Sequence, residues 1–237
     1  GLDVETNGGD ITLGGGNTTA TSYAIGENDE AWSEGIRIDD VLNLLSGGGD
    51  ILIQGKTSTR SVNTSLYGNA GVGVYGLDSN GIINSGTGII TIKGVNQNAT
   101  SETTYSSGVL FALNNNNKTT ITSSGTVSNT IQIIGQGTGT NGNVFGMEIE
   151  ESSPLSILAS GDGGGITLST GQSSTASNKY DLVARSTLEV LAKDGPINLT
   201  SIEGGSEEGT FYFSSLPYFG SKAGSSITES SSDILIQ

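Results

Sequence analysis

Acidic side chains are the groups in this chain best suited to chemistry. They cluster at four places, Glu27/Asp29/Glu30/Glu34, Asp39/Asp40, Glu148/Glu150/Glu151 and Glu203/Glu207/Glu208. Such clusters could bind calcium weakly or supply a pair of general acids and bases. None has the spacing of an EF-hand loop or of a calcium-binding glycine-aspartate repeat. We therefore interpret them as solvated loop charges and predict no metal site.

These carboxylates have few partners for catalysis. The chain contains neither histidine nor cysteine, which excludes a Ser-His-Asp triad, disulfides and imidazole or thiolate metal ligands. Its arginines are Arg37, Arg60 and Arg185, and its lysines are scattered, so no basic cluster accompanies the acids. We expect neither enzymatic activity nor a cofactor. A carbohydrate-active enzyme similar to a polysaccharide lyase is the alternative.

Aromatic side chains are the candidates for ligand contacts. Five of them fall within residues 211–219, and Trp32 lies in the longest loop. Trp32, Tyr212, Tyr218 and Phe219 could stack on a sugar or anchor a protein partner. A structural role is the favoured alternative, in which Phe211 and Phe213 are core residues while Tyr218 and Phe219 fold a loop onto the protein.

A repeat of about 37 residues positions these side chains. Each repeat carries three strand patterns in a fixed order, and each pattern places aliphatic residues two apart after a turn. The first strand has Ile11/Leu13, Ile51/Ile53, Ile90/Ile92, Ile131/Ile133, Ile166/Leu168, Ile197/Leu199 and Ile234/Ile236. The second has Ile36/Ile38, Val72/Val74, Val109/Phe111, Phe145/Met147/Ile149, Tyr180/Leu182 and Phe211/Phe213. The third has Leu42/Leu44, Ile82, Ile121, Leu155/Ile157, Leu188/Val190 and Ile227.

This alternation buries one face of every strand, and stacking successive repeats is the way to cover that face. The sequence therefore predicts an all-β fold, a parallel β-helix or β-solenoid, with one coil of three strands per repeat. Residues 1–237 form a single segment of about six repeats. Residues 2–6 resemble a third strand and residues 234–237 a first strand, so we expect a piece of a longer array without its caps.

Charge and hydropathy narrow the range of partners. The formal net charge is −15, which opposes binding to nucleic acid and to anionic membranes. No apolar run is long enough for a membrane-spanning helix, and no signal peptide opens the chain. We expect a mature, soluble fragment without membrane insertion.

The turn-strand units resemble those of a known family. Residues 49–55 (GDILIQG), 88–94 (GIITIKG) and 160–168 (SGDGGGITL), separated by Ser/Thr-rich spacers, are similar to the filamentous-haemagglutinin-like exoproteins of two-partner secretion. The resemblance covers nearly the whole chain. It implies a right-handed parallel β-helix, export by an outer-membrane partner transporter, and display as a long rod on the bacterial surface.

The predicted function is a structural and adhesive rod segment of a secreted bacterial surface protein. Its loops would contact a cell-surface glycan or protein, or copies of the same chain. A self-associating cell-surface layer or fibre component is a further alternative.

Overall fold

The computed structural model describes residues 1–15, 22–26, 34–58, 69–97, 105–113, 116–139, 142–174, 178–202, 210–221, 225–228 and 233–236. These residues form strands, turns and bends, and no helix among them is long and apolar enough to cross a membrane. Trp32 and Arg60 lie outside the described residues.

The strands form three parallel sheets that correspond to the three predicted strand positions. The first sheet contains β2 (Ile11–Leu13), β6 (Ile51–Lys56), β9 (Ile90–Val95), β12 (Ile131–Gly139), β15 (Ile166–Ser174), β18 (Ile197–Ser201) and β21 (Ser225–Thr228), and β3 (Ala24–Ile25) pairs with β6 at its edge. The second contains β4 (Ile36–Asp39), β7 (Asn69–Tyr75), β10 (Tyr105–Ala112), β13 (Asn143–Ile149), β16 (Asn178–Ala184), β19 (Thr210–Phe213) and β22 (Asp233–Ile236). The third contains β1 (Leu2–Glu5), β5 (Leu42–Leu45), β8 (Gly81–Asn84), β11 (Thr119–Ser123), β14 (Leu155–Ala159), β17 (Leu188–Ala192) and β20 (Tyr218–Ser221).

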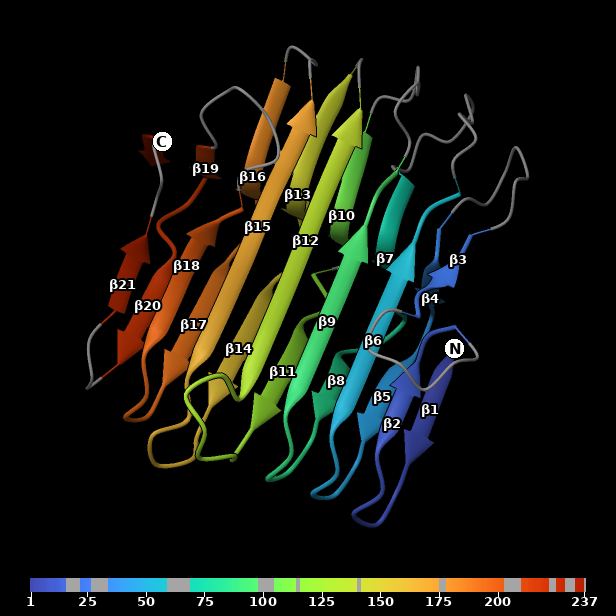
Figure 1. The fold of residues 1–237 in the computed structure, drawn as a ribbon, viewed down its shortest axis with the longest axis vertical. Helices are drawn as coiled ribbons and strands as arrows, with labels where there is room; N and C mark the ends of the chain where they lie inside the picture. The colour runs from blue at the N-terminus through green and yellow to red at the C-terminus, as the bar shows by residue number, and fades with distance from the viewer. Residues whose placement is uncertain are drawn as a thin grey trace.

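The fold is a right-handed parallel β-solenoid, as predicted. The long strands of the first sheet run upward in front, the other two sheets run back behind them, and successive coils progress from right to left (Figure 1). Each repeat makes one coil, because Ile51 pairs directly with Ile90 and Ile90 with Ile131. Seven strands are stacked in order in each sheet, and the six spacings of about 4.8 Å between them give a stack about 29 Å long.

One aliphatic column runs through the stack. Ile11, Ile51, Ile90, Ile131, Ile166 and Ile197 are consecutive register partners, and all are buried. The inward residues of the other two sheets belong to the same core cluster. The predicted hydrophobic column is thus confirmed.

Glycines let the first and second sheets touch through their backbones. A Cβ on Gly94 would lie 1.9 Å from the carbonyl oxygen of Gly108, and one on Gly135 would lie 2.2 Å from that of Gly146. The same pattern relates Gly55 to Gly71. Only residues without a side chain allow this approach, so the glycines fix where the two sheets cross.

Beyond this crossing the two sheets enclose polar side chains instead of aliphatic ones. The Asn96 amide donates to the carbonyl of Asn69 at 2.8 Å, and the Thr138 hydroxyl donates to the carbonyl of Asn96 at 2.7 Å. Thr57, Asn69 and Asn96 are all buried. The coil therefore combines an aliphatic compartment with a hydrogen-bonded polar one.

Two strand assignments from the sequence are wrong. Ile83, not Ile82, faces the core in β8, because Ile83 aligns with Leu44 and Ile121 on the neighbouring coils. In the last coil, β20 occupies the third sheet, which shifts the remaining strands by one position. Ile227 therefore pairs with Leu199 in the first sheet, and residues 234–236 pair with 211–213 in the second.

Candidate functional site

The outer face of the second sheet brings together the polar and aromatic groups of greatest interest. The pairing between neighbouring strands is interrupted at one residue in each of four strands. These residues are Gly71, Gly108, Gly146 and Asp181. The strands bend at this position. Side chains before and after the bend therefore lie on the same face of the sheet, although simple alternation would place them on opposite faces. Ser107 and Glu148 illustrate this, because the serine hydroxyl donates to the Glu148 carboxylate at 2.6 Å.

Glu148 is a carboxylate with no exposed surface. One of its oxygens accepts the bond from Ser107, and the other pairs with the guanidinium of Arg185. Burial raises the pKa of Glu148, while the Ser107 hydrogen bond and the Arg185 charge partly offset that rise. Burial and the charge of Glu148 also raise the pKa of neighbouring Glu150. This pair of carboxylates holds protons more readily than free glutamate does.

A row of aromatic rings crosses three coils beside this pair. The rings of Phe145 and Tyr180 stack at 6.0 Å with a 25° angle between their planes, and Tyr180 and Tyr212 are 5.6 Å apart and tilted by 48°. Phe145 is fully buried, whereas Tyr180 and Tyr212 are half-buried. The guanidinium carbon of Arg185 lies 5.2 Å from the Phe145 ring centroid, a cation–π geometry. The row therefore ends in two tyrosines with accessible surface.

A second charged cluster lies at the N-terminal end of the same face. Arg37 binds the Asp39 carboxylate through two nitrogens, at 2.7 and 3.0 Å, and contacts Glu34 at 3.2 Å. Its guanidinium carbon stands 4.1 Å from the Tyr75 ring centroid. The Tyr75 hydroxyl donates to Glu34 at 3.2 Å, and burial together with the Glu34 charge raises the pKa of Tyr75 well above its usual value. Both bonds to Glu34 use the same carboxylate oxygen, and its other oxygen is buried without a hydrogen-bond partner among the described residues.

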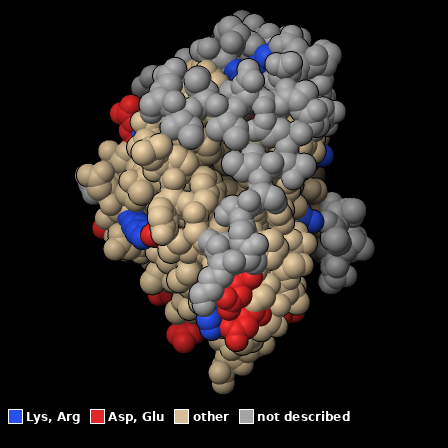
Figure 2. Space-filling view, turned by 90° about the vertical axis from the view of Figure 1, so that its left-hand side faces the viewer, with Lys and Arg blue, Asp and Glu red and all other residues tan. Residues whose placement is uncertain are grey.

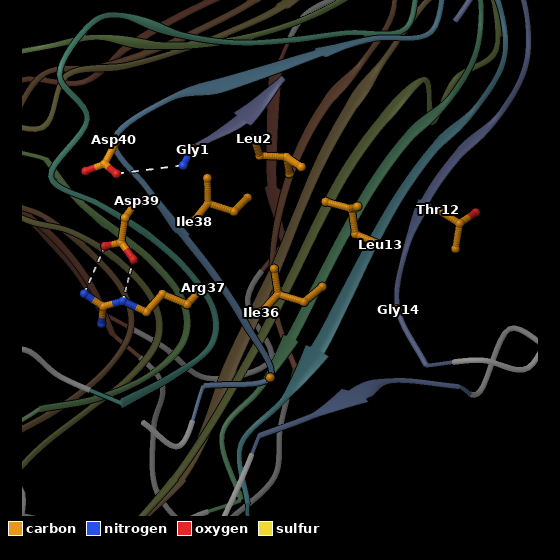
Figure 3. A pocket seen from close by; sticks show the side chains of 11 residues that line it. Gly1, Leu2, Thr12, Leu13, Gly14, Ile36, Arg37, Ile38, Asp39 and Asp40 are labelled. Atoms are coloured by element: carbon orange, nitrogen blue, oxygen red, sulfur yellow. Dashed lines mark hydrogen bonds and ion pairs between the residues drawn. The ribbon is translucent and has the colours of Figure 1, made fainter. Parts of the chain in front are cut away.

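A hollow of about 690 Å³ opens at the N-terminal end of the aliphatic column. Leu2, Leu13 and Ile36 line it and point toward one another, while Arg37 and Asp39 point away (Figure 3). The amino group of Gly1 and the Asp40 carboxylate are 3.8 Å apart at its rim. The lining of the hollow combines these aliphatic side chains with the charged residues Arg37, Asp39 and Asp40.

The structure separates the aromatic residues proposed as ligand contacts. Tyr212 lies on the outer face of the second sheet, and Tyr218, 61% exposed, lies on the third sheet. Phe219 packs against the core, with its ring edge-on to Phe213 at 6.3 Å. Trp32 lies outside the described residues. Tyr212 and Tyr218 therefore belong to different surfaces.

The interpretation of the acidic clusters as solvated charge is wrong for Glu148 and Glu34, because both side chains are buried and ion-paired, Glu148 with Arg185 and Glu34 with Arg37. Among the remaining acids, Asp39 pairs with Arg37, while Glu27, Asp29, Glu30, Glu203, Glu207 and Glu208 lie outside the described residues. In the described ranges, no group of three or more acidic side chains is placed to hold a metal ion. Among the described residues in the view from the C-terminal end, charged atoms form separate groups between uncharged ones (Figure 2).

Sequence reasoning missed two members of this site. The strand pattern predicts Tyr180 and Phe145 in the core, but the bend at Asp181 turns Tyr180 outward, and the same bend at Gly146 removes Phe145 from the aliphatic column. The available signal was Glu148, a charged residue between Met147 and Ile149 in an otherwise apolar strand. Such a residue needs a buried partner, and Arg185 is one coil away.

No protein-family model matches the chain, and neither a curated protein nor a solved structure is significantly similar to it.

Proposed function

We propose that this chain is a structural and adhesive rod segment of a secreted bacterial surface protein. The observation that carries the proposal is the in-register column of buried isoleucines across the coils. Each coil buries its apolar face against its neighbours, and every inner strand is hydrogen-bonded on both sides. Such a stack is stiff along its axis and suited to holding a binding surface away from a cell.

Two further features support adhesion as the role of the rod. Tyr180 and Tyr212 place accessible aromatic surface on a rigid sheet, an arrangement typical of recognition sites. The resemblance of the turn-strand units to filamentous-haemagglutinin-like exoproteins supports export through an outer-membrane partner and display on the bacterial surface. The partner of the rod would be a cell-surface glycan or protein.

Attachment of coated beads to cells tests this function. Beads carrying the 237-residue chain should attach to cultured epithelial cells, and excess soluble chain should compete. Beads carrying the heat-denatured chain serve as the control, because they present the same composition without the fold. Equal attachment of both kinds of bead, or none by the folded chain, would refute the proposal.

A carbohydrate-active enzyme is a second candidate, and one observation favours it. Glu148 and Glu150 have raised pKa values, and Arg185 is paired with Glu148. A carboxyl group that holds its proton beside a cation could act as the proton donor of an enzyme. Both Glu148 oxygens are already engaged, however, and its side chain is buried. Release of sugar ends from a panel of neutral and acidic polysaccharides, abolished in Glu148→Gln, would favour the enzyme over the rod.

A further inference from the structure

The two ends of the solenoid carry edge strands of the same three sheets in the same order along the chain (Figure 1). At the N-terminal end these strands are β1 in the third sheet, β2 in the first and β4 in the second. At the C-terminal end they are β20 in the third sheet, β21 in the first and β22 in the second. The described stack therefore consists of whole coils, and each strand at one end has a counterpart from the same sheet at the other.

The direction of the strands allows the two ends to meet. The pairings that join successive coils are parallel in all three sheets at both ends of the stack. A second copy shifted along the axis would therefore place its β1 beside β20, its β2 beside β21 and its β4 beside β22. An edge strand presents unpaired N–H and C=O groups, and this contact would pair them as the coils pair within one chain.

The apolar side chains at the edge of the first coil are partly buried and pack against the core. They are Leu2, Val4, Leu13 and Ile36. One coil further in, the register partner of Val4 is Leu44, which is 0% exposed, and that of Leu13 is Ile53, which is 1% exposed. A further coil at this end would cover the edge side chains in the same way, which is favourable because it removes apolar surface from water.

The hollow at this end has the composition of a protein interface. Leu2, Leu13 and Ile36 line it and face one another, while Arg37 and Asp39 in the lining point away (Figure 3). An apolar centre with charged residues around it is typical of a contact between two protein surfaces.

The core columns end at the C-terminal end in residue types that match their first members. Followed coil by coil in register, the column of Val4 ends at Phe219, that of Leu13 at Ile227 and that of Ile36 at Ile234. On the outer face of the third sheet, the row of Asp3 ends at Tyr218 and that of Glu5 at Gly220. In a second copy stacked in register, apolar residues would therefore follow apolar ones, and neither Asp3 nor Glu5 would face an acid.

We propose that the N-terminal end of this chain binds the C-terminal end of a second copy, so that the coils continue across the junction. The second copy is the occupant that these observations favour, because it supplies three strands with the order, direction and register that the N-terminal end requires. A head-to-tail contact between straight rods does not close into a ring and extends into an unbranched filament. Assembly of this kind goes beyond the proposed adhesive function and does not depend on it.

Sedimentation velocity of the full 237-residue chain at increasing concentration tests the association. The formal net charge of −15 makes copies repel one another, whereas the contact itself is apolar and hydrogen-bonded. Association should therefore increase with salt as well as with concentration, up to about 1 M salt, where the Debye length is about 3 Å. The expected result is a growing series of species, seen as filaments by electron microscopy. A monomer under all these conditions, or a dimer that grows no further, would overturn the inference.

A charge placed at the junction should block the association. Val4→Asp puts a carboxylate among the apolar residues of the contact, and burial of an unpaired charge is costly. It should raise the concentration needed for association by about tenfold or more. Asn43→Asp is the matched control, because it adds the same charge to the outer face of β5, one coil inward. Equal association of the two variants would contradict the proposed contact.

Disulfide trapping identifies the contact even if Val4→Asp unfolds. The chain has no cysteine, and a stack about 29 Å long separates its ends, so Asp3→Cys/Tyr218→Cys cannot close within one molecule. Mild oxidation of this variant should yield a ladder of disulfide-linked multimers. In the control Asp3→Cys/Glu189→Cys the second cysteine lies one coil inward from the end, and the ladder should be absent. A ladder from the control, or none from the first pair while circular dichroism melting shows it folded, would refute the junction.

Discussion

At the scale of single residues, Glu148 is the group whose chemistry departs most from expectation. Its side chain is fully buried, and its partners come from the coils on either side of β13, Ser107 from β10 and Arg185 from the position directly after β16. Removing either partner would leave a buried carboxylate partly unsatisfied, which is costly. The residue therefore ties three coils together through one carboxylate.

The raised pKa of Glu148 predicts a specific dependence of stability on pH. A folded-state pKa above the unfolded value means that the folded protein binds the proton more tightly, so ionisation of Glu148 opposes folding. As the pH falls from 7 through the raised pKa, the free energy of unfolding of the wild type should rise relative to Glu148→Gln. The gain should be complete below the ordinary glutamate pKa of 4.5.

Urea denaturation of both proteins between pH 7 and pH 4 measures this difference. Taking the difference between the two proteins cancels the contribution of carboxylates distant from Glu148. The Glu148 charge raises the pKa of Glu150, so the difference reports these two carboxylates together. A constant difference across the range, or one that falls with acid, would contradict the assigned burial of Glu148.

At the scale of the elements, the sequence predicts which strands form and where, because alternation and glycine turns are local signals. It does not predict which of two adjacent isoleucines faces inward. In β8 both Ile82 and Ile83 suit a strand, and only the alignment with Leu44 and Ile121 on neighbouring coils decides. The last coil was misassigned for a related reason, since Tyr218 and Phe219 supply its third strand without an aliphatic pair.

The corrected register of β8 predicts unequal effects of two neighbouring substitutions. Ile83 is 1% exposed and Ile82 is 39% exposed. Ile83→Ala should lower the free energy of unfolding by about 2–5 kcal/mol, because it leaves a cavity in the column. Ile82→Ala should cost less than about 1 kcal/mol. Equal losses in urea denaturation, or a larger loss at Ile82, would restore the register first predicted.

The glycine crossing predicts a strong effect from adding one methyl group. Gly94→Ala places a Cβ 1.9 Å from the Gly108 carbonyl oxygen and should destabilise the protein by about 1–3 kcal/mol or more, because two backbones must separate. Gly9→Ala is the matched control, since its nearest neighbour would be 3.7 Å away. Thermal unfolding followed by circular dichroism compares them, and similar melting temperatures would argue against the crossing.

At the scale of the whole molecule, the repeat alone predicts a rod, but not the second compartment of the coil. Asn96 and Thr138 lie beyond the aliphatic pairs that the repeat identifies, and the Thr138 hydroxyl donates to the Asn96 carbonyl where the two sheets meet. Alternation of apolar and polar residues along a strand indicates only that one face of the strand is buried. It does not report whether an aliphatic core or a second sheet covers that face, and for this reason the bend that exposes Tyr180 was also missed.

The central claim is that each repeat forms one coil stacked in register on the next, and engineered disulfides test it most directly. The chain has no cysteine, so an introduced pair has no competitors. Thr91 and Gln132 are register partners on adjacent coils, whereas Leu52 and Gln132 are two coils apart. A disulfide needs Cα atoms about 4.4–6.8 Å apart, which adjacent coils provide and alternate coils do not. Under mild oxidation, Thr91→Cys/Gln132→Cys should close a disulfide, and Leu52→Cys/Gln132→Cys should stay reduced. Closure of the second pair in place of the first would contradict the stacked solenoid.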